Sequence, residues 1–506
     1  MLKTNIKLAA IITYISIFVG VAISLVSTPF IVSILGKSEY GLFSLVNSII
    51  AYIALLDLGF GSAVVRFNAK YLSEKNEVGK QGVNGMFLML YSFIGLVSLI
   101  ISFILFQNLN SIFHNTLTLS ELVIFKKIFI IAAINVAISF PLNVFSSIIT
   151  ANERFVFLKI VNLFKTILTP LIMVLVLFIG YKSLGMVIVT LIINLLVGVI
   201  NIFFCRFKLN LVIKLSTINL KLLREIFSYS FFIFLSAIAF QIYWNADQFI
   251  IGLYLGATPI AVYAIATQLN SYITNFSNVI SSFYLPRFTK MIVNKADTEE
   301  IMSELIRIGR IQCFIVGYIF SGFVLFGESF ITLWVGESYR YSYTIAIIII
   351  IPQVFSIIQS LFATMLEAMN MHRVKAYIYL SIAILNIFLT VLFIPRWGIL
   401  GCAIATAIGM LINALVNNLY YNMKLKLSIR HFWVQIIKVF IPIFIITLGS
   451  SIALNFISIT SYLSLFLFVC LYSLLFALTM VSFGMNQEEK NLLILPIKKV
   501  VLNLFK

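Results

Sequence analysis

Apolar stretches long enough to cross a lipid bilayer recur along the whole of this 506-residue chain. A membrane-spanning helix needs about 20 consecutive residues that are predominantly apolar. Stretches of this kind lie at residues 9–34, 41–65, 83–106, 122–148, 158–180, 184–205, 228–254, 259–285, 311–334, 343–366, 376–394, 398–421, 433–457 and 462–484. The sequence therefore predicts about fourteen transmembrane helices joined by short connections.

The composition indicates the same class of protein. Hydrophobic residues make up 62% of the chain and charged residues 10%, whereas a soluble domain averages about 45–50% and about 25%. A bilayer accommodates this apolar surface because its interior is itself an apolar solvent. The first stretch, Leu8 to Leu35, is longer than the roughly 7–15 apolar residues of a cleavable signal peptide, so we expect it to be retained. The predicted fold class is an all-α polytopic membrane protein.

Basic residues are distributed unevenly between the connections of this predicted membrane domain. The N-terminal tail, the even-numbered connections and the C-terminal tail carry most of the Lys and Arg. The odd-numbered connections and their margins hold Lys37, Lys126, Lys127, Lys182, Arg340 and Arg396. Because short basic loops are retained in the cytoplasm, both termini are predicted to be cytoplasmic.

The chain also contains an internal repeat. Leu184 to Asn201 aligns with Leu400 to Asn417, and Arg66 aligns with Arg287, at separations of 216 and 221 residues. A repeat of six helices gives both halves the same orientation, which is a known plan of transporters. The predicted domains are a six-helix bundle at 1–206, a cytoplasmic linker at 207–227, a second six-helix bundle at 228–422, and an extra helix pair with a cytoplasmic tail at 423–506.

Motifs for enzymatic or metal chemistry are missing from the sequence. The four cysteines and three histidines are widely separated, so neither a metal nor a cofactor is predicted. The tripeptide Gly36-Lys37-Ser38 lacks the glycine that a phosphate-binding loop requires five residues earlier, because that position is Ile31. The net charge of +18 raises the question of nucleic acid, but no stretch is suited to form a folded recognition domain. We expect no enzyme activity and no nucleic-acid partner.

Ionisable residues inside apolar stretches are costly and are therefore candidates for function. Asp57 and Asp247 are candidate proton or sodium sites, and pairing with a neighbouring helix is the alternative for Asp57. The candidate substrate-binding cations are Lys126, Lys127, Lys165, Arg66 and Arg287. The alternatives are snorkelling for Lys165, and anchoring at the membrane interface for the other four.

Polar uncharged residues extend this candidate site. Asn245 lies in the most polar of the predicted helices, and Gln268 and Asn275 lie along one face of the next. They complete the predicted substrate-binding set, and hydrogen bonding between helices is the alternative. The stretch from Asn294 to Arg310 alternates acids and bases and is predicted to be a solvated helix.

Several short motifs resemble those of polysaccharide repeat-unit flippases (Wzx-like) of the multidrug/oligosaccharidyl-lipid/polysaccharide exporter superfamily. They are Leu56-Asp57-Leu58-Gly59 through Arg66, Ala151-Asn152-Glu153-Arg154-Phe155, Asn245-Ala246-Asp247-Gln248-Phe249 through Leu255-Gly256, Pro286-Arg287-Phe288, and Leu184-Gly185 with Leu400-Gly401. The resemblance implies two six-helix bundles around a cavity that opens alternately to each side of a bacterial cytoplasmic membrane. It also implies undecaprenyl-diphosphate-linked oligosaccharide as the cargo, for O-antigen, capsule or related polymers, with polysaccharide polymerase machinery as a candidate partner.

The predicted cations suit such a cargo, because a diphosphate in a low-dielectric cavity needs cationic partners. Two alternatives of the same fold remain open: a multidrug or cation antiporter, for which Asp57 and Asp247 would be the key residues, and a flippase for peptidoglycan or teichoic-acid precursors. A membrane-embedded polymerase or ligase is disfavoured, because the external connections are too short to supply acid and base residues.

Overall fold

The structure is a computed structural model that describes residues 6–214, 220–369, 371–457 and 459–491. Every regular element in these ranges is a helix. The chain divides into two compact units: unit 1 comprises Met1–Ala264 and Tyr379–Cys402, and unit 2 comprises Ile265–Ile378 and Ala403–Lys506. These bounds differ from those of the predicted bundles, and the division into two six-helix bundles stays a prediction.

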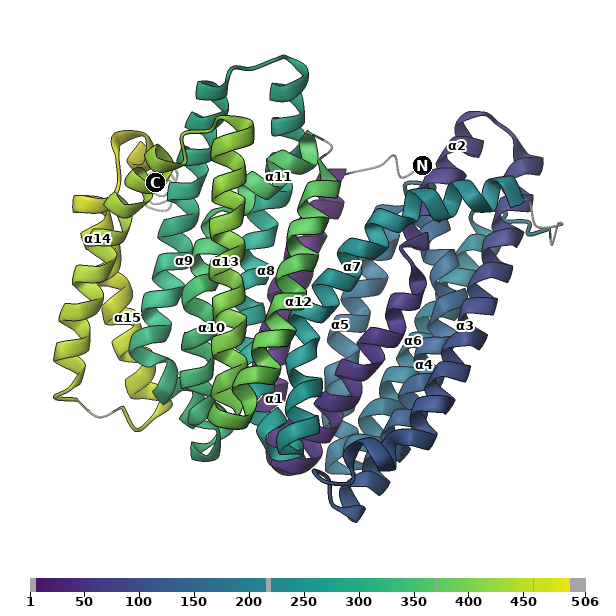
Figure 1. The fold of residues 1–506 in the computed structure, drawn as a ribbon, viewed down its shortest axis with the longest axis horizontal. Helices are drawn as coiled ribbons and strands as arrows, with labels where there is room; N and C mark the ends of the chain where they lie inside the picture. Colours follow the sequence, from purple (N-terminus) through teal and green to yellow (C-terminus); the bar gives the residue numbers. More distant parts are fainter. Residues whose placement is uncertain (1–5, 215–219, 370, 458, 492–506) are drawn as a thin grey trace, which may run out of the picture. The chain divides into compact units, whose positions relative to one another are not determined.

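Unit 1 is a bundle of long helices packed along one another. Its elements are α1 (Ile6–Ile53), η1 (Ala54–Asp57), α2 (Phe60–Ser73), α3 (Glu77–Phe113), α4 (Leu119–Ala151), α5 (Phe155–Phe178), α6 (Lys182–Phe207), α7 (Leu220–Leu255) and most of α12 (His372–Trp397). α3 and α6 both pack against α4, and α5 packs along α1. Figure 1 shows α3, α4 and α6 side by side.

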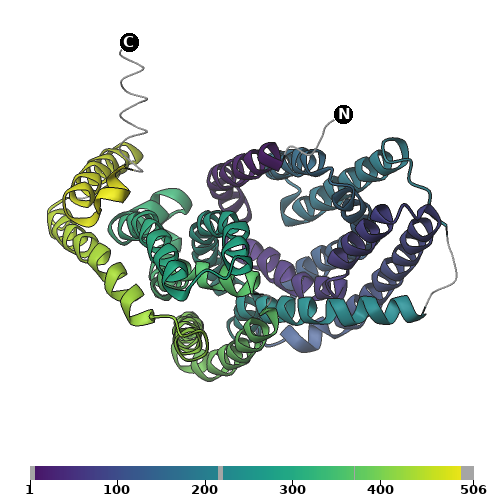
Figure 2. The same ribbon diagram turned by 90° about the horizontal axis from the view of Figure 1, so that it is seen from above.

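Unit 2 is organised around α9. Its elements are most of α8 (Ala257–Val293), α9 (Thr298–Val335), η2 (Glu337–Tyr339), α10 (Tyr341–Ile358), α11 (Ser360–Ala368), most of α13 (Ile399–Leu425), α14 (Ile429–Leu454), α15 (Tyr462–Thr479) and the π-helical turn η3 (Met480–Gly484). α10, α14 and α15 all contact α9. Seen from above, α14 and α15 lie along one edge of unit 2 (Figure 2).

Eleven of the described helices are long and apolar enough to cross a membrane, and a bent pair within α7 raises this to as many as twelve. One of the eleven, Ile11–Ser73, has 63 residues, about three times the length that one crossing needs. It covers two of the predicted spans, because Gly36 interrupts α1 with φ 71 and ψ 173. The chain is therefore a multi-pass, all-helical membrane protein; the count of fourteen spans and the repeat stay predictions.

Large apolar side chains are exposed on the outer faces of the helices in both units. Phe103 on α3 is 60% exposed and Phe444 on α14 is 63% exposed. Such surfaces would face the hydrocarbon of a bilayer, where no water needs to be excluded. The packing therefore agrees with the hydropathy of the sequence.

Glycines with left-handed backbone conformations mark two turns that the predicted repeat makes equivalent. Gly36 (φ 71) divides α1, and Gly256 (φ 84) separates α7 from α8. A Cβ atom on Gly256 would lie 2.6 Å from the carbonyl oxygen of Thr116. This second turn therefore requires glycine for its φ and for the close approach of another backbone segment.

The predicted solvated helix between Asn294 and Arg310 differs from the structure. Asp297 caps the N-terminus of α9 by accepting a hydrogen bond from the backbone N–H of Glu300, and α9 continues without a break to Val335. Glu304 and Arg310 are buried within it. The alternating charges pair with protein groups and not only with water, so this expectation was wrong for those two residues.

Candidate functional site

Asp247 on α7 is a buried carboxylate, 2% exposed, at the meeting point of three helices. One of its oxygens accepts a hydrogen bond from the hydroxyl of Tyr263 on α8, and the other accepts one of 3.1 Å from the hydroxyl of Thr390 on α12. An arrangement of carboxylate and hydroxyl oxygens suits a proton or a hard cation, which prefers oxygen ligands. The sequence indicated Asp247 but neither partner, because both lie on other helices.

Asp57 lies where a transmembrane helix breaks. Leu58 (φ 52) and Gly59 (φ 73) are both left-handed, and α2 begins immediately afterwards. The Asp57 carboxylate accepts a 2.8 Å hydrogen bond from the hydroxyl of Tyr91 on α3 and further bonds from the backbone N–H groups of Gly59 and Gly61. It therefore caps the positive end of the α2 dipole. This geometry supports the structural alternative for Asp57, and a role in ion coupling stays a prediction.

The predicted lysines of unit 1 lie in different surroundings. Lys165, in the middle of α5, is half-buried. The ammonium group of Lys126 lies 5.3 Å from the centroid of the Phe106 ring on α3, which is a cation–π contact. Lys127, the next residue, is exposed. The contact of Lys126 with an aromatic ring favours the anchoring alternative, whereas Lys165 keeps its place as a candidate.

The predicted arginines lie one in each unit. Arg66 is exposed on α2 in unit 1. In unit 2, the guanidinium of Arg287 lies 2.9 Å from one carboxylate oxygen of Glu304, and Arg307 contacts the other oxygen at 2.9 Å. Arg287 therefore already has an acidic partner, which it shares with Arg307.

The predicted amide residues hydrogen-bond within and between helices. The Asn245 amide donates to the side-chain oxygen of Gln241 (3.0 Å), and Gln241 donates to the carbonyl oxygen of Ala51 on α1 (2.8 Å). In unit 2, the Gln268 amide donates to the hydroxyl of Tyr272 (2.6 Å), while Asn275 is exposed. The contacts of Asn245 fit the alternative in which amides join neighbouring helices.

A network of carboxylates at the turn after Gly36 was not foreseen. Ser38 donates a hydrogen bond to Glu121 at the start of α4. Glu39 accepts bonds from the backbone N–H (3.0 Å) and the hydroxyl (2.6 Å) of Ser183, and it lies 3.7 Å from Lys182. Glu39 thus satisfies the N-terminus of α6, whose first N–H groups have no partner within the helix. The sequence carried no spacing signal for contacts between such distant segments.

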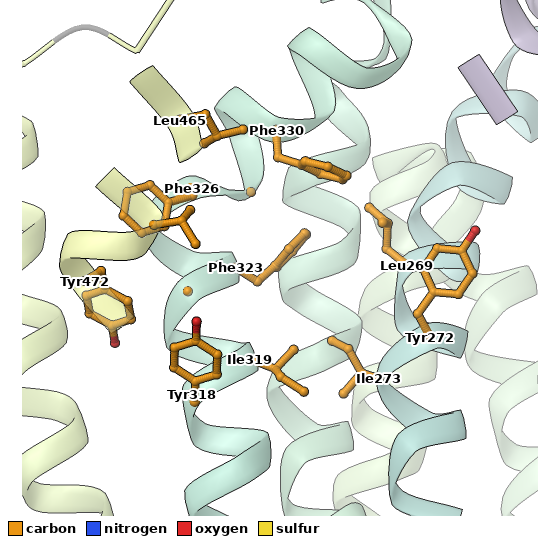
Figure 3. Close-up of a pocket in the computed structure, with 13 residues that line it drawn as sticks. Leu269, Tyr272, Ile273, Tyr318, Ile319, Phe323, Phe326, Phe330, Leu465 and Tyr472 are labelled. Carbon is orange, nitrogen blue, oxygen red and sulfur yellow. The ribbon is translucent and has the colours of Figure 1, made fainter. Parts of the chain in front are cut away.

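An apolar cavity of about 320 Å³ lies in unit 2 among α8, α9 and α15. Figure 3 shows side chains of α8 and α9 that reach toward the same space from opposite sides. The lining residues are Leu269, Tyr272, Ile273, Tyr318, Ile319, Gly322, Phe323, Phe326, Gly327, Phe330, Leu465, Val469 and Tyr472. None of them is charged, so this cavity suits hydrocarbon and not a sugar or a phosphate.

A second apolar cavity, of about 520 Å³, lies in unit 1 among α1, η1, α3, α7 and α12. Its lining residues are Ile49, Tyr52, Ile53, Leu56, Ile101, Leu105, Ile242, Ala246, Phe249, Ile250, Ile387 and Val391. Tyr52 contributes the one hydroxyl group of this lining. Neither cavity was predicted, because each is built from helices that are distant in sequence.

Comparison with known proteins shows the family to which this chain belongs. The model of the family described as "Polysaccharide biosynthesis protein" matches residues 8–292, more than half of the chain. The chain belongs to this family, which confirms the resemblance drawn from the short motifs.

Two relatives carry names that describe transport. The "Putative O-antigen transporter" of Shigella flexneri is 22% identical over 405 residues, which cover 78% of this chain and 92% of that protein. The "Probable low-salt glycan biosynthesis flippase Agl15" of Haloferax volcanii is 22% identical over 208 residues, 41% of this chain and 44% of that protein.

Solved structures show the same fold. The lipid II flippase MurJ, in an inward closed conformation, superposes with a TM-score of 0.72 at 19% identity and covers 93% of this chain and 98% of its own. An inward-facing multidrug resistance MATE family transporter of the MOP superfamily superposes with a TM-score of 0.67 at 13% identity, over 80% of this chain and 94% of its own. At these identities the likeness defines the fold alone.

Proposed function

We propose that this protein is a flippase. Its cargo would be undecaprenyl-diphosphate-linked oligosaccharide repeat units, carried from the cytoplasmic to the outer leaflet of a bacterial cytoplasmic membrane by alternating access. The product would feed the synthesis of O-antigen, capsule or a related polysaccharide. The observation that carries the proposal is the match with an O-antigen transporter over 92% of that protein's length, together with membership of the polysaccharide biosynthesis family.

One basic side chain inside the membrane domain supports an anionic cargo. Lys165 lies half-buried in the middle of a transmembrane helix. A buried ammonium group is costly unless an anion approaches it. A diphosphate would supply that anion, so Lys165 is the residue that we assign to the phosphate groups.

The cavity of unit 2 supports a cargo with a hydrocarbon chain. Its third wall is α15, which falls in the helix pair predicted to lie outside the repeat. We assign this cavity to part of the polyprenyl chain, with the rest of the chain in the surrounding lipid.

The test uses Lys165→Ala and Lys165→Arg in cells or vesicles that accumulate lipid-linked oligosaccharide on the outer leaflet. We expect Lys165→Ala to stop accumulation at normal protein abundance and Lys165→Arg to retain part of it. The matched control is Lys159→Ala, on the same helix about 9 Å nearer its start at 1.5 Å per residue. Normal export by Lys165→Ala would show that the lysine only snorkels to the membrane surface.

The orientation of the termini is tested separately. A cysteine in place of Lys75 or Lys214 should react with an impermeant thiol reagent only after the cytoplasm is opened. Labelling of either position in intact cells would contradict the predicted topology.

A cation-coupled drug antiporter is the second candidate, favoured by the buried carboxylate of Asp247 and its two hydroxyl donors. It predicts efflux of organic cations that requires Asp247 and does not require Lys165. The proposed flippase requires Lys165 for export. Lys165→Ala and Lys165→Arg therefore separate the two functions.

A further inference from the structure

Part of the cavity of unit 1 corresponds, residue by residue, to part of the cavity of unit 2. Ile49, Tyr52 and Ile53 line the cavity of unit 1. The residues 220 positions later line the cavity of unit 2 and keep the same order of residue types: Leu269, Tyr272 and Ile273. The first set lies on α1 and the second on α8. This offset falls between the separations of 216 and 221 residues found for the predicted repeat.

A second wall corresponds in the same way. Ile101 and Leu105 of α3 line the cavity of unit 1, and Gly322 and Phe326 of α9, 221 positions later, line that of unit 2. α15 closes the cavity of unit 2, whereas α7 and α12 close that of unit 1. Each unit therefore forms an apolar cavity from one equivalent pair of helices and closes it with a different third wall.

The cavity of unit 1 opens toward the hydrocarbon of the bilayer. Val391 of the lining is 41% exposed, and its neighbours on α12, Phe388 and Leu392, are 64% and 52% exposed. On α3, Phe103 beside the lining is 60% exposed. The helices that flank the opening thus present apolar side chains to lipid, and a chain in the bilayer reaches the cavity without crossing a polar surface.

Filling this cavity with a hydrocarbon chain is favourable because of packing. A void forfeits the dispersion contacts of the atoms that line it, and apolar cavities in proteins stay free of water and take up apolar molecules. In a membrane the surrounding solvent is itself made of such chains.

We propose that the cavity of unit 1 binds one acyl chain of a bilayer phospholipid. The chain of the proposed cargo is the less suitable occupant, because Ala246 lines the cavity and the next residue is the buried carboxylate of Asp247. That carboxylate would repel the diphosphate of a cargo that is carried across the membrane beside it, whereas the phosphate of a resident phospholipid stays at the membrane surface. The assignment goes beyond the proposed function, since it concerns a resident lipid and not the cargo.

The experiment uses the full-length protein in vesicles that contain a phospholipid with a photoactivatable diazirine on one acyl chain. Lipid in the bulk bilayer labels every exposed face, so the informative positions are the buried lining residues Ala246 (4% exposed) and Ile250 (6% exposed). We expect peptides with these residues to carry adducts, and Ile53→Trp, which fills the cavity, to lower those adducts at least about tenfold. Phe103→Trp, on the lipid-facing side of α3, is the matched control and should leave them unchanged.

Three outcomes would overturn the proposal. The first is the absence of adducts at the buried lining, and the second is adducts that persist in Ile53→Trp. The third is loss of the adducts when a polyprenyl phosphate is added at a concentration that leaves the labelling of the exposed Phe444 unchanged. The last result would assign the cavity to an isoprenoid chain. Should Ile53→Trp fail to fold, Val391→Phe narrows the cavity from its opening and must lower the same adducts. None of these results depends on whether the protein exports oligosaccharide, so failure here is distinguishable from failure of the proposed function.

Discussion

The two apolar cavities each have two walls formed by helices that correspond in the predicted repeat, α1 and α3 in unit 1 and α8 and α9 in unit 2. They differ in the third wall and in the polar groups next to it. In unit 1 it is formed by α7 and α12, which also carry Asp247 and its partner Thr390. In unit 2 it is formed by α15, which is joined to α9 by neutral hydrogen bonds. The cavity of unit 1 therefore lies beside a buried carboxylate with hydroxyl partners. The cavity of unit 2 lies beside helices that neutral hydrogen bonds join to one another.

Polar contacts hold α15 to α9 at several levels. They are Tyr462 to the carbonyl of Leu333 (2.5 Å), Tyr472 to Ser321 (2.5 Å), and Tyr318 with Ser473 (2.5 Å). Beyond the end of α15, Arg310 of α9 binds Glu489 through two hydrogen bonds and donates to the carbonyl oxygens of Gly484 and Gln435. These contacts indicate that α15 is an integral wall of unit 2 and not a loosely attached helix.

The largest effect that we expect comes from breaking the pair of Arg310 and Glu489. Their side chains are 9% and 1% exposed. Arg310→Met would leave Glu489 buried without its partner, and such a change costs about 3–5 kcal/mol. Thermal unfolding in detergent and the abundance in membranes should both fall sharply.

The control for that change is the double variant Arg310→Met with Glu489→Met. Removing both charges leaves no unpaired buried ion, so most of the lost stability should return. If the double variant is as unstable as Arg310→Met alone, the backbone carbonyl contacts of Arg310 and not its ion pair fasten the third wall.

In unit 1 the corresponding test concerns Asp247. Asp247→Asn keeps the shape of the side chain and one accepting oxygen, so it retains the hydrogen bond from only one of Tyr263 and Thr390, and it carries no charge. We expect it to fold with a loss of about 1 kcal/mol and to export cargo at a rate that no longer responds to an imposed proton or sodium gradient. Initial rates in vesicles with and without each gradient are the measurement.

Two comparisons sharpen that result. Asp247→Ala, which leaves two hydroxyls without their acceptor, should lose more stability than Asp247→Asn. A gradient response in Asp247→Asn equal to that of the natural protein would show that Asp247 takes no part in ion coupling and that its role is structural.

The sequence predicted the long helices well, because hydropathy depends on local composition. Residues 83–106 fall within α3 and 122–148 within α4. It also indicated Asp57 and Asp247, because a carboxylate in an apolar stretch is conspicuous. It did not indicate Tyr91, Tyr263 or Thr390, since each partner lies on another helix and a hydroxyl in a membrane helix is common.

The error at Glu304 and Arg310 has a physical cause. Acids and bases at helical spacing look alike whether they meet water or a distant segment of the chain. Glu304 meets Arg287, 17 residues away, and Arg310 meets Glu489, 179 residues away. Only the three-dimensional fold distinguishes such a pair from a solvated face, and the cavities, whose walls come from distant helices, escape sequence analysis for the same reason.

A smaller effect should follow from Tyr91→Phe at the helix break in unit 1. The change removes one of the donors to the Asp57 carboxylate and leaves the backbone donors in place. A hydrogen bond to a charged group contributes about 1.5–3 kcal/mol, and the remaining donors should hold the loss near the lower end. Tyr71→Phe, whose ring packs beside Gly79, is the matched control for the midpoint of thermal unfolding. Equal shifts for both variants would show that Tyr91 acts through packing and not through Asp57.

The smallest effect should come from an ion pair on the surface of unit 1. Lys80 and Glu77, one turn apart on α3, lie 3.3 Å from each other, and their side chains are 13% and 66% exposed. Because the carboxylate is open to solvent, the pair should contribute about 0.2–1 kcal/mol and be screened by salt. Glu77→Gln should therefore lower the midpoint of thermal unfolding only slightly, and about 1 M salt should abolish the difference. Arg310 and Glu489 also form a pair of base and acid, but their side chains are buried. The loss of stability in Arg310→Met should therefore persist in salt. On this view, burial decides how much an ion pair contributes to stability. A loss of stability in Arg310→Met that salt abolishes, or a large loss in Glu77→Gln that salt leaves unchanged, would contradict it.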